Sequence, residues 1–89
     1  MPYIKQSDRG HFDALVDQFD RLDLGHAVTM GQMNYHITSL LITWLGAEPH
    51  YYADYNGALG VLEAVKLEFY RRAVAPYEDT KREANGDVF

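Results

Sequence analysis

The chain has 89 residues, a length that fits one small domain, and 47% of them are hydrophobic, as in an ordinary folded protein. Thirteen acidic against eight basic side chains give a formal net charge of −5. This charge argues against a nucleic-acid partner, because such binding depends on lysines and arginines that neutralise phosphates. The absence of cysteine excludes disulfides, thiolate catalysis and cysteine-based zinc sites.

No part of the sequence has the length and hydrophobicity of a signal peptide or of a membrane-spanning helix. An apolar run such as residues 40–42 is far too short to cross a bilayer. Together with the lack of cysteine, this pattern predicts a cytoplasmic protein without membrane association.

The first predicted helix covers residues 8–23. Ser7 or Asp8 is expected to cap its first turn, and Gly25 to end it in a left-handed conformation. Its apolar side chains recur at spacings of three and four residues, on one side of a helix. They are Phe12, Leu15, Val16, Phe19 and Leu22.

A second helix is predicted from Thr29 to Leu45. Thr29 and Gln32 have the spacing of a capping box, and Gly46 is a typical helix end. Its main apolar side consists of Met33, Ile37, Leu40, Leu41 and Trp44.

The third helix is predicted to begin with Asp54 as its cap and to reach about Ala75, where Pro76 ends or kinks it. A short helix over residues 77–84 follows, with acidic residues in its first turn and basic residues near its end. The sequence therefore predicts an all-α fold. It is a single helical domain over residues 1–89, with three main helices and a short C-terminal helical extension.

The second and third helices have more apolar surface than one side of each would need. The residues beyond the main apolar sides are Tyr35, Ile42 and Leu45 in the second helix and Leu67 and Val74 in the third. One explanation is that neighbouring helices of the same chain cover these side chains. The other is a homodimer in which they form a shared apolar seam, since small domains often complete their core by oligomerisation.

Lys66 falls on the apolar side of the predicted third helix, near Leu62 and Phe69. A buried lysine would need a carboxylate partner, and in a cleft it could bind phosphate or transfer a proton. The alternative is that its stem lies along apolar surface while the ammonium group reaches water.

Two further features admit both a functional and a structural interpretation. His36, at the edge of the apolar side of the second helix, belongs to a residue type that often serves as a general base but also fits a boundary residue bonded to backbone or water. The loop residues His50, Tyr51 and Tyr52 either form a recognition surface for a protein partner or cap the open end of the bundle.

The sequence resembles a family of short, uncharacterised helical proteins from bacterial and phage genomes. The resemblance rests on the start MPYI, on GVLEAVKLEFYRR at residues 60–72 and on PYEDTKREANGDV at residues 76–88. It implies a compact helical protein and carries over no activity, ligand or catalytic residue. It draws attention to a shared surface formed by Glu63, Lys66, Glu68, Tyr70, Arg71 and Arg72.

The leading functional hypothesis is a small dimeric helical module that contacts an unidentified protein through its aromatic loop or its charged C-terminal half. The alternative is a small phosphate- or nucleotide-binding enzyme in which Lys66, Arg71 and Arg72 contact phosphate and Glu63 or Glu68 holds a divalent ion. Residues 63 and 68 point in different directions from one helix, and no nucleophile motif such as G-x-S-x-G is present. The sequence leaves enzymatic activity open and indicates neither a metal site nor a cofactor.

Overall fold

A computed structural model describes all 89 residues, which form helices and turns and no strands. The predicted all-α fold, with three main helices and a C-terminal helical extension, is confirmed. The chain divides into two compact units, which we describe separately. The N-terminal unit is Tyr3–Tyr51, and the C-terminal unit is Tyr52–Phe89 together with Met1–Pro2.

The first helix of the N-terminal unit is shorter than predicted. A 3-10 turn, η1 (Gln6–Asp8), precedes helix α1 (Gly10–Asp20). The expected cap at Ser7 or Asp8 was wrong, because both residues belong to the 3-10 turn, where the amide of Asp8 donates to the Lys5 carbonyl at 2.9 Å. Arg9 occupies the cap position without a side-chain hydrogen bond to the helix.

Helix α1 ends three residues before its predicted end. The amide of Leu22 donates to the Phe19 carbonyl at 3.0 Å, an i→i+3 bond that tightens the last turn. The Asp23 carboxylate then accepts from the Gly25 amide at 2.8 Å, and Gly25 takes the expected left-handed conformation with φ of 76°.

Helix α2 (Met30–Leu45) begins and ends as predicted. The Thr29 hydroxyl accepts from the Gln32 amide at 3.1 Å, and the Gln32 side chain accepts from the Thr29 amide at 3.0 Å, which completes the capping box. Gly46 follows the helix with φ of 80°, a conformation that an L-residue rarely adopts.

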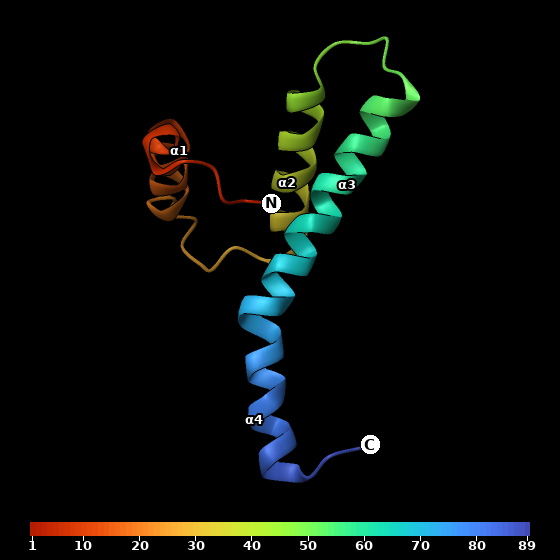
Figure 1. Cartoon of the computed structure of the whole chain (residues 1–89). Coiled ribbons are helices and arrows are strands. Elements are labelled where there is room, and N and C mark those ends of the chain that lie inside the picture. Colours follow the sequence, from red (N-terminus) through yellow and green to blue (C-terminus); the bar gives the residue numbers. More distant parts are fainter. The chain divides into compact units, whose positions relative to one another are not determined.

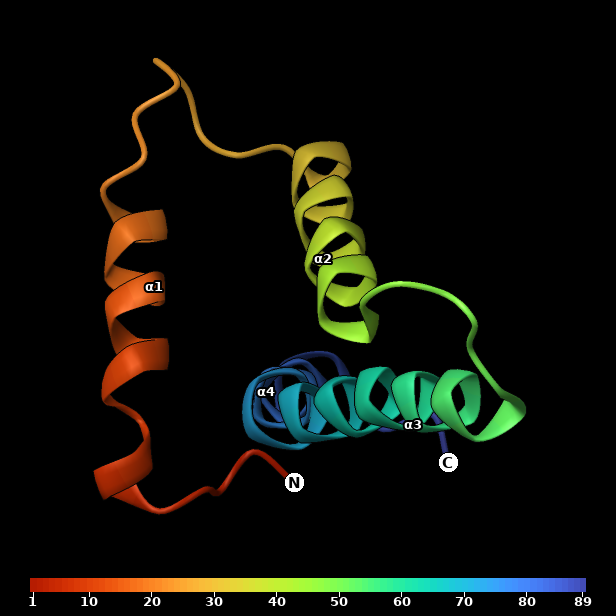
Figure 2. The ribbon, with the colours of Figure 1, turned by 90° about the horizontal axis from the view of Figure 1, so that it is seen from above.

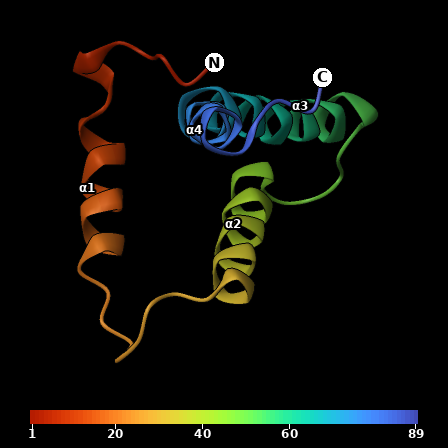
Figure 3. The same ribbon diagram turned by 90° about the horizontal axis from the view of Figure 1, so that it is seen from below.

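Helices α1 and α2 run in opposite directions, joined by the loop over residues 21–29 (Figures 2 and 3). They meet where the ring of Phe19 stacks on the imidazole of His36, with ring centroids 5.5 Å apart and planes 12° from parallel. This stacking supports the interpretation of His36 as a boundary residue of α2.

Residues 52–85 of the C-terminal unit form one continuous helical rod, drawn from green to blue in Figure 1. It consists of α3 (Tyr52–Phe69), the π-helical segment η2 (Tyr70–Val74) and α4 (Ala75–Asn85). The expected cap at Asp54 was wrong, because the helix begins two residues earlier. Asp54 lies instead within its first turn, where a carboxylate is favourable beside the positive end of the helix dipole.

Pro76 neither ends the helix nor separates a short helix over residues 77–84, as the sequence suggested. Its ring would clash with the carbonyl four residues earlier in an α-helix, and it donates no hydrogen bond. The chain adopts the wider π-helical turn of η2 directly before this proline, and the helix then continues to Asn85. Gly86, with φ of 92°, follows the end.

Only Ala58 is buried in the structure, and large apolar side chains on every helix are exposed. A side chain that is exposed in the whole chain is also exposed in its own unit. Neither unit therefore encloses an apolar core of its own, and the apolar sides of its helices need a cover from outside that unit.

Candidate interaction surface

Helix α2 carries two apolar sides and no Asp, Glu, Lys or Arg. The second side consists of Tyr35, Thr38, Ile42 and Leu45, which we call the seam. Seam residues are spaced by three, four and three residues, the spacing of the contact positions in a coiled coil. At about 100° per residue, Ile42 projects roughly 140° away from Ile37 on the main apolar side.

The seam is open within the N-terminal unit. Tyr35 is 75% exposed and Ile42 is 63% exposed, and Leu45 is half-buried. Helix α1 contacts α2 at His36, whose direction differs from that of Ile42 by about 120°. Helix α1 therefore lies on another side of α2 and leaves the seam free.

Thr38 and Tyr35 are the members of the seam that carry a hydroxyl group, and the hydroxyl of Thr38 is already satisfied. It donates to the Asn34 carbonyl at 2.8 Å and lies 3.3 Å from the Asn34 side-chain oxygen. A hydroxyl that is bonded within its own helix does not oppose burial as a free donor would. The seam is thus able to lose water around Thr38, whereas the Tyr35 hydroxyl at its amino end needs water or a polar group of the partner.

The two seam residues predicted in the third helix lie on either side of a change in helix geometry. Leu67 is exposed in α3, and Val74 is half-buried at the end of η2. Hydrogen bonds in η2 close over five residues instead of four, so the chain turns less per residue there. In a continuous α-helix, Val74 would point in nearly the same direction as Leu67. The π-helical turn rotates Val74 away from that direction.

Lys66 is exposed. Its ammonium nitrogen lies 3.5 Å from Glu63 Oε1, and its side chain is 73% exposed. Within the C-terminal unit, the ammonium group of Lys66 thus reaches solvent, as in the alternative interpretation.

Two of the other charged residues of the candidate phosphate site form an ion pair with each other. Arg71 donates to Glu68 at 2.7 Å, and the Glu68 side chain is only 23% exposed. The structure thus pairs Glu68 with Arg71, and Arg72 forms no ion pair. No three histidine, aspartate or glutamate side chains come together in a group able to hold a metal ion.

Tyr70 differs from the other residues of the proposed shared surface, because it makes a contact along the rod. Its hydroxyl donates to Glu78 Oε2 at 2.9 Å, across the π-helical segment. This hydrogen bond and the charge of the Glu78 carboxylate raise the pKa of the Tyr70 phenol above its usual range. Sequence reasoning missed this contact, and Pro76 was the one signal that pointed to altered geometry at this place.

The loop aromatics occur where one unit passes to the other. The His50 imidazole lies 3.1 Å from the Gly46 carbonyl, which closes the loop after α2. Tyr51 and Tyr52 are 71% and 82% exposed, respectively. Because Tyr51 belongs to the N-terminal unit and Tyr52 to the C-terminal unit, their exposure describes each residue by itself.

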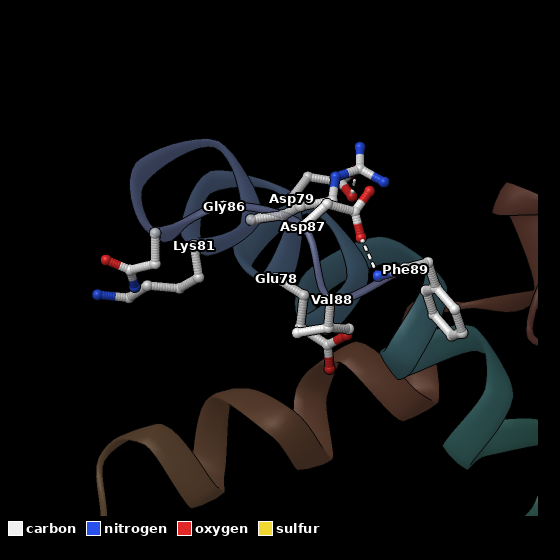
Figure 4. Close-up of a pocket in the computed structure, with 9 residues that line it drawn as sticks. Glu78, Asp79, Lys81, Gly86, Asp87, Val88 and Phe89 are labelled. Carbon is white, nitrogen blue, oxygen red and sulfur yellow. Dashed lines mark hydrogen bonds and ion pairs between the residues drawn. The ribbon is translucent and has the colours of Figure 1, made fainter.

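An open groove of about 460 Å³ lies between the last turns of α4 and residues 86–89 (Figure 4). Its charged groups include the ion pair of Arg82 with Asp79 at 3.6 Å. The Phe89 amide donates to the Asp87 carboxylate at 3.0 Å, as the dashed line in the figure marks. The residues around the groove are exposed, and most of them belong to the charged block of residues 76–88 that carries the family resemblance.

Comparison with known proteins gives a family and no further relative. The model of a family described as a domain of unknown function, DUF6899, matches residues 1–88. No curated protein and no solved structure matches the chain. None of its helices combines the length and the hydrophobicity needed to cross a membrane. Since the match covers the chain almost from end to end, the protein belongs to the DUF6899 family.

Proposed function

We propose that this protein is a small helical protein–protein interaction module that presents the seam of α2 to another protein chain. The observation that carries this proposal is the pair of apolar sides on α2, which project about 140° apart. A helix that is apolar on two sides is normally covered on both.

The chain has too few apolar helices to cover both sides of α2. Helix α1 meets α2 at His36, away from the seam, and α4 is largely polar, with charged residues at five of its eleven positions. Of the remaining helices, α3 alone has an extended apolar side, and a single helix is able to cover only one of two sides that project about 140° apart. The main side of α2, with Trp44 and Leu40, is the larger, so the seam is the side that we assign to another chain.

The composition of the seam suits recognition of an apolar helix. An exposed contiguous set of apolar side chains without charge is typical of a surface that meets another protein. Tyr35 and Ile42 supply the large side chains, and Thr38 supplies a methyl group beside a satisfied hydroxyl. A helix laid along positions spaced by three and four residues would contact all of them.

Matched substitutions on the two sides of α2 test this proposal. Ile42→Glu should lower the free energy of unfolding of the single chain by no more than about 1 kcal/mol, because the seam is open to water when no partner is bound. Ile37→Glu should cost several kcal/mol, because it places a carboxylate on the side assigned to the core. Denaturant unfolding at low protein concentration measures both values.

Equal and large losses for the two variants would contradict the proposal. They would mean that the chain itself covers both sides of α2. Thr43→Glu, on the polar side of the same helix, is the control for the effect of a glutamate on helix propensity.

A further inference from the structure

We infer that the occupant of the seam is the seam of a second copy of this chain, with the two α2 helices packed antiparallel. This inference rests on the proposed function and adds the identity of the partner and the direction of its helix. Two features found together on α2 support it. Helix α2 is the one α-helix of this acidic protein without an Asp, Glu, Lys or Arg residue, and its seam residues have the spacing of a coiled coil.

Helix α2 differs from the other helices in having no charged residue, and this difference makes it suited to a contact between two copies of the chain. Two copies of a chain with a net charge of −5 repel each other, most strongly where carboxylates would face carboxylates. Asp13 lies in the first turn of α1, Asp54 in the first turn of α3 and Glu78 in the first turn of α4, whereas neither end of α2 has an acidic or basic residue. Helix α2 is therefore the helix along which two copies meet without charge repulsion.

The absence of charge also favours a copy over a partner of different chemistry. A basic or acidic partner would gain from complementary charges around the seam, and α2 offers none. A two-fold interface instead needs a surface that is complementary to itself. A row of apolar side chains meets this requirement, because each residue accepts an apolar neighbour.

The antiparallel direction follows from the helix dipole and the spacing of the seam. No charged side chain of α2 offsets the positive amino end or the negative carboxyl end of its dipole. An antiparallel partner places opposite ends side by side. A two-fold axis through the middle of the seam then sets Tyr35 opposite the partner's Leu45 and Thr38 opposite the partner's Ile42.

Engineered cysteines test the partner and the direction together, since the natural chain has no cysteine that would interfere. Tyr35→Cys and Leu45→Cys are prepared as separate proteins in the full chain, mixed and oxidised gently. The antiparallel pair predicts a disulfide dimer in the mixture at least about tenfold more abundant than in either protein alone. Disulfide formation requires Cα atoms within about 7 Å, which only facing positions reach. Thr43→Cys, on the polar side of α2, is the control and should form no disulfide-linked dimer.

Other outcomes overturn the inference in separate ways. Efficient cross-linking of Tyr35→Cys with itself would show parallel helices and contradict the antiparallel direction. No cross-linking above the Thr43→Cys control would contradict the second copy as the occupant. In that case the stability of Ile42→Glu decides the proposed function. Small destabilisation leaves the seam as a surface for a different protein, and destabilisation as large as that of Ile37→Glu removes the surface as well.

Discussion

At the scale of single residues, the charges of α3 form local pairs on the helix surface. Lys66 and Glu63 are separated by three positions, and both side chains are more than half exposed. An exposed pair at this spacing contributes a few tenths of a kcal/mol, because water screens it and both side chains lose freedom. The ammonium group of Lys66 thus adds little to the stability of the helix.

Substitution of Lys66 by methionine should therefore be nearly neutral. Lys66→Met keeps the length of the side chain and removes its charge, so the free energy of unfolding should change by less than about 0.5 kcal/mol. The midpoint of denaturant unfolding, at an unchanged slope, measures this difference. A loss of about 3 kcal/mol or more would instead mean that Lys66 and a carboxylate are buried together.

At the scale of elements, the sequence predicted best where the deciding contacts are local. The capping box of α2 depends on Thr29 and Gln32 alone, and both of its hydrogen bonds are present. The cap of α1 was mispredicted because Ser7 takes part in a 3-10 turn that competes for the same residues. The spacing of apolar residues is compatible with either an α-helical turn or a 3-10 turn at a helix start. It could therefore not determine the first residue of α1.

The rod from α3 to α4 shows a second limit of sequence reasoning. Pro76 was expected to interrupt the helix, but the π-helical turn of η2 removes the steric conflict and lets the helix continue. This turn also changes which side chains face each other. Tyr70 and Glu78 would differ by about 80° in direction in an α-helix, yet they are hydrogen-bonded across η2. Residue spacing along an ideal helix could not have predicted this pair.

The contact between Tyr70 and Glu78 makes the stability of the rod sensitive to alkaline pH. The hydrogen bond to Glu78, its charge and a smaller effect of Asp79 raise the pKa of Tyr70 in the folded chain. Because the bond favours the neutral phenol, its contribution to stability is fully present below the unfolded pKa near 10. That contribution is lost as the pH rises through the higher folded pKa.

Spectroscopic titration of tyrosine ionisation checks this expectation. The difference between the wild-type chain and Tyr70→Phe should show one phenol that titrates above the usual range, and Glu78→Gln should lower that pKa by removing the charge. Tyr77→Phe serves as the control, since Tyr77 has no such hydrogen bond to a carboxylate. An unchanged Tyr70 titration in Glu78→Gln would contradict the bridge across η2.

At the scale of the whole molecule, the sequence already showed that the second and third helices have more apolar surface than one side of each needs. The structure was needed to decide which side of α2 is left open by α1. The two sides of α2 followed from periodicity, and the stacking of Phe19 on His36 then located α1 away from the seam. Leu67 and Val74 were expected to extend the seam into the third helix, and η2 separates their directions. The proposed contact between copies is thus concentrated on α2.

Sedimentation equilibrium of the full chain at micromolar concentrations tests self-association through α2 most directly. The wild-type protein and Thr43→Glu should each sediment with twice the chain mass of 10.2 kDa. Ile42→Glu should raise the dissociation constant of the dimer at least about tenfold and approach the mass of one chain, because a carboxylate would be buried without a partner. A wild-type protein that keeps the mass of one chain over this whole concentration range would contradict the account.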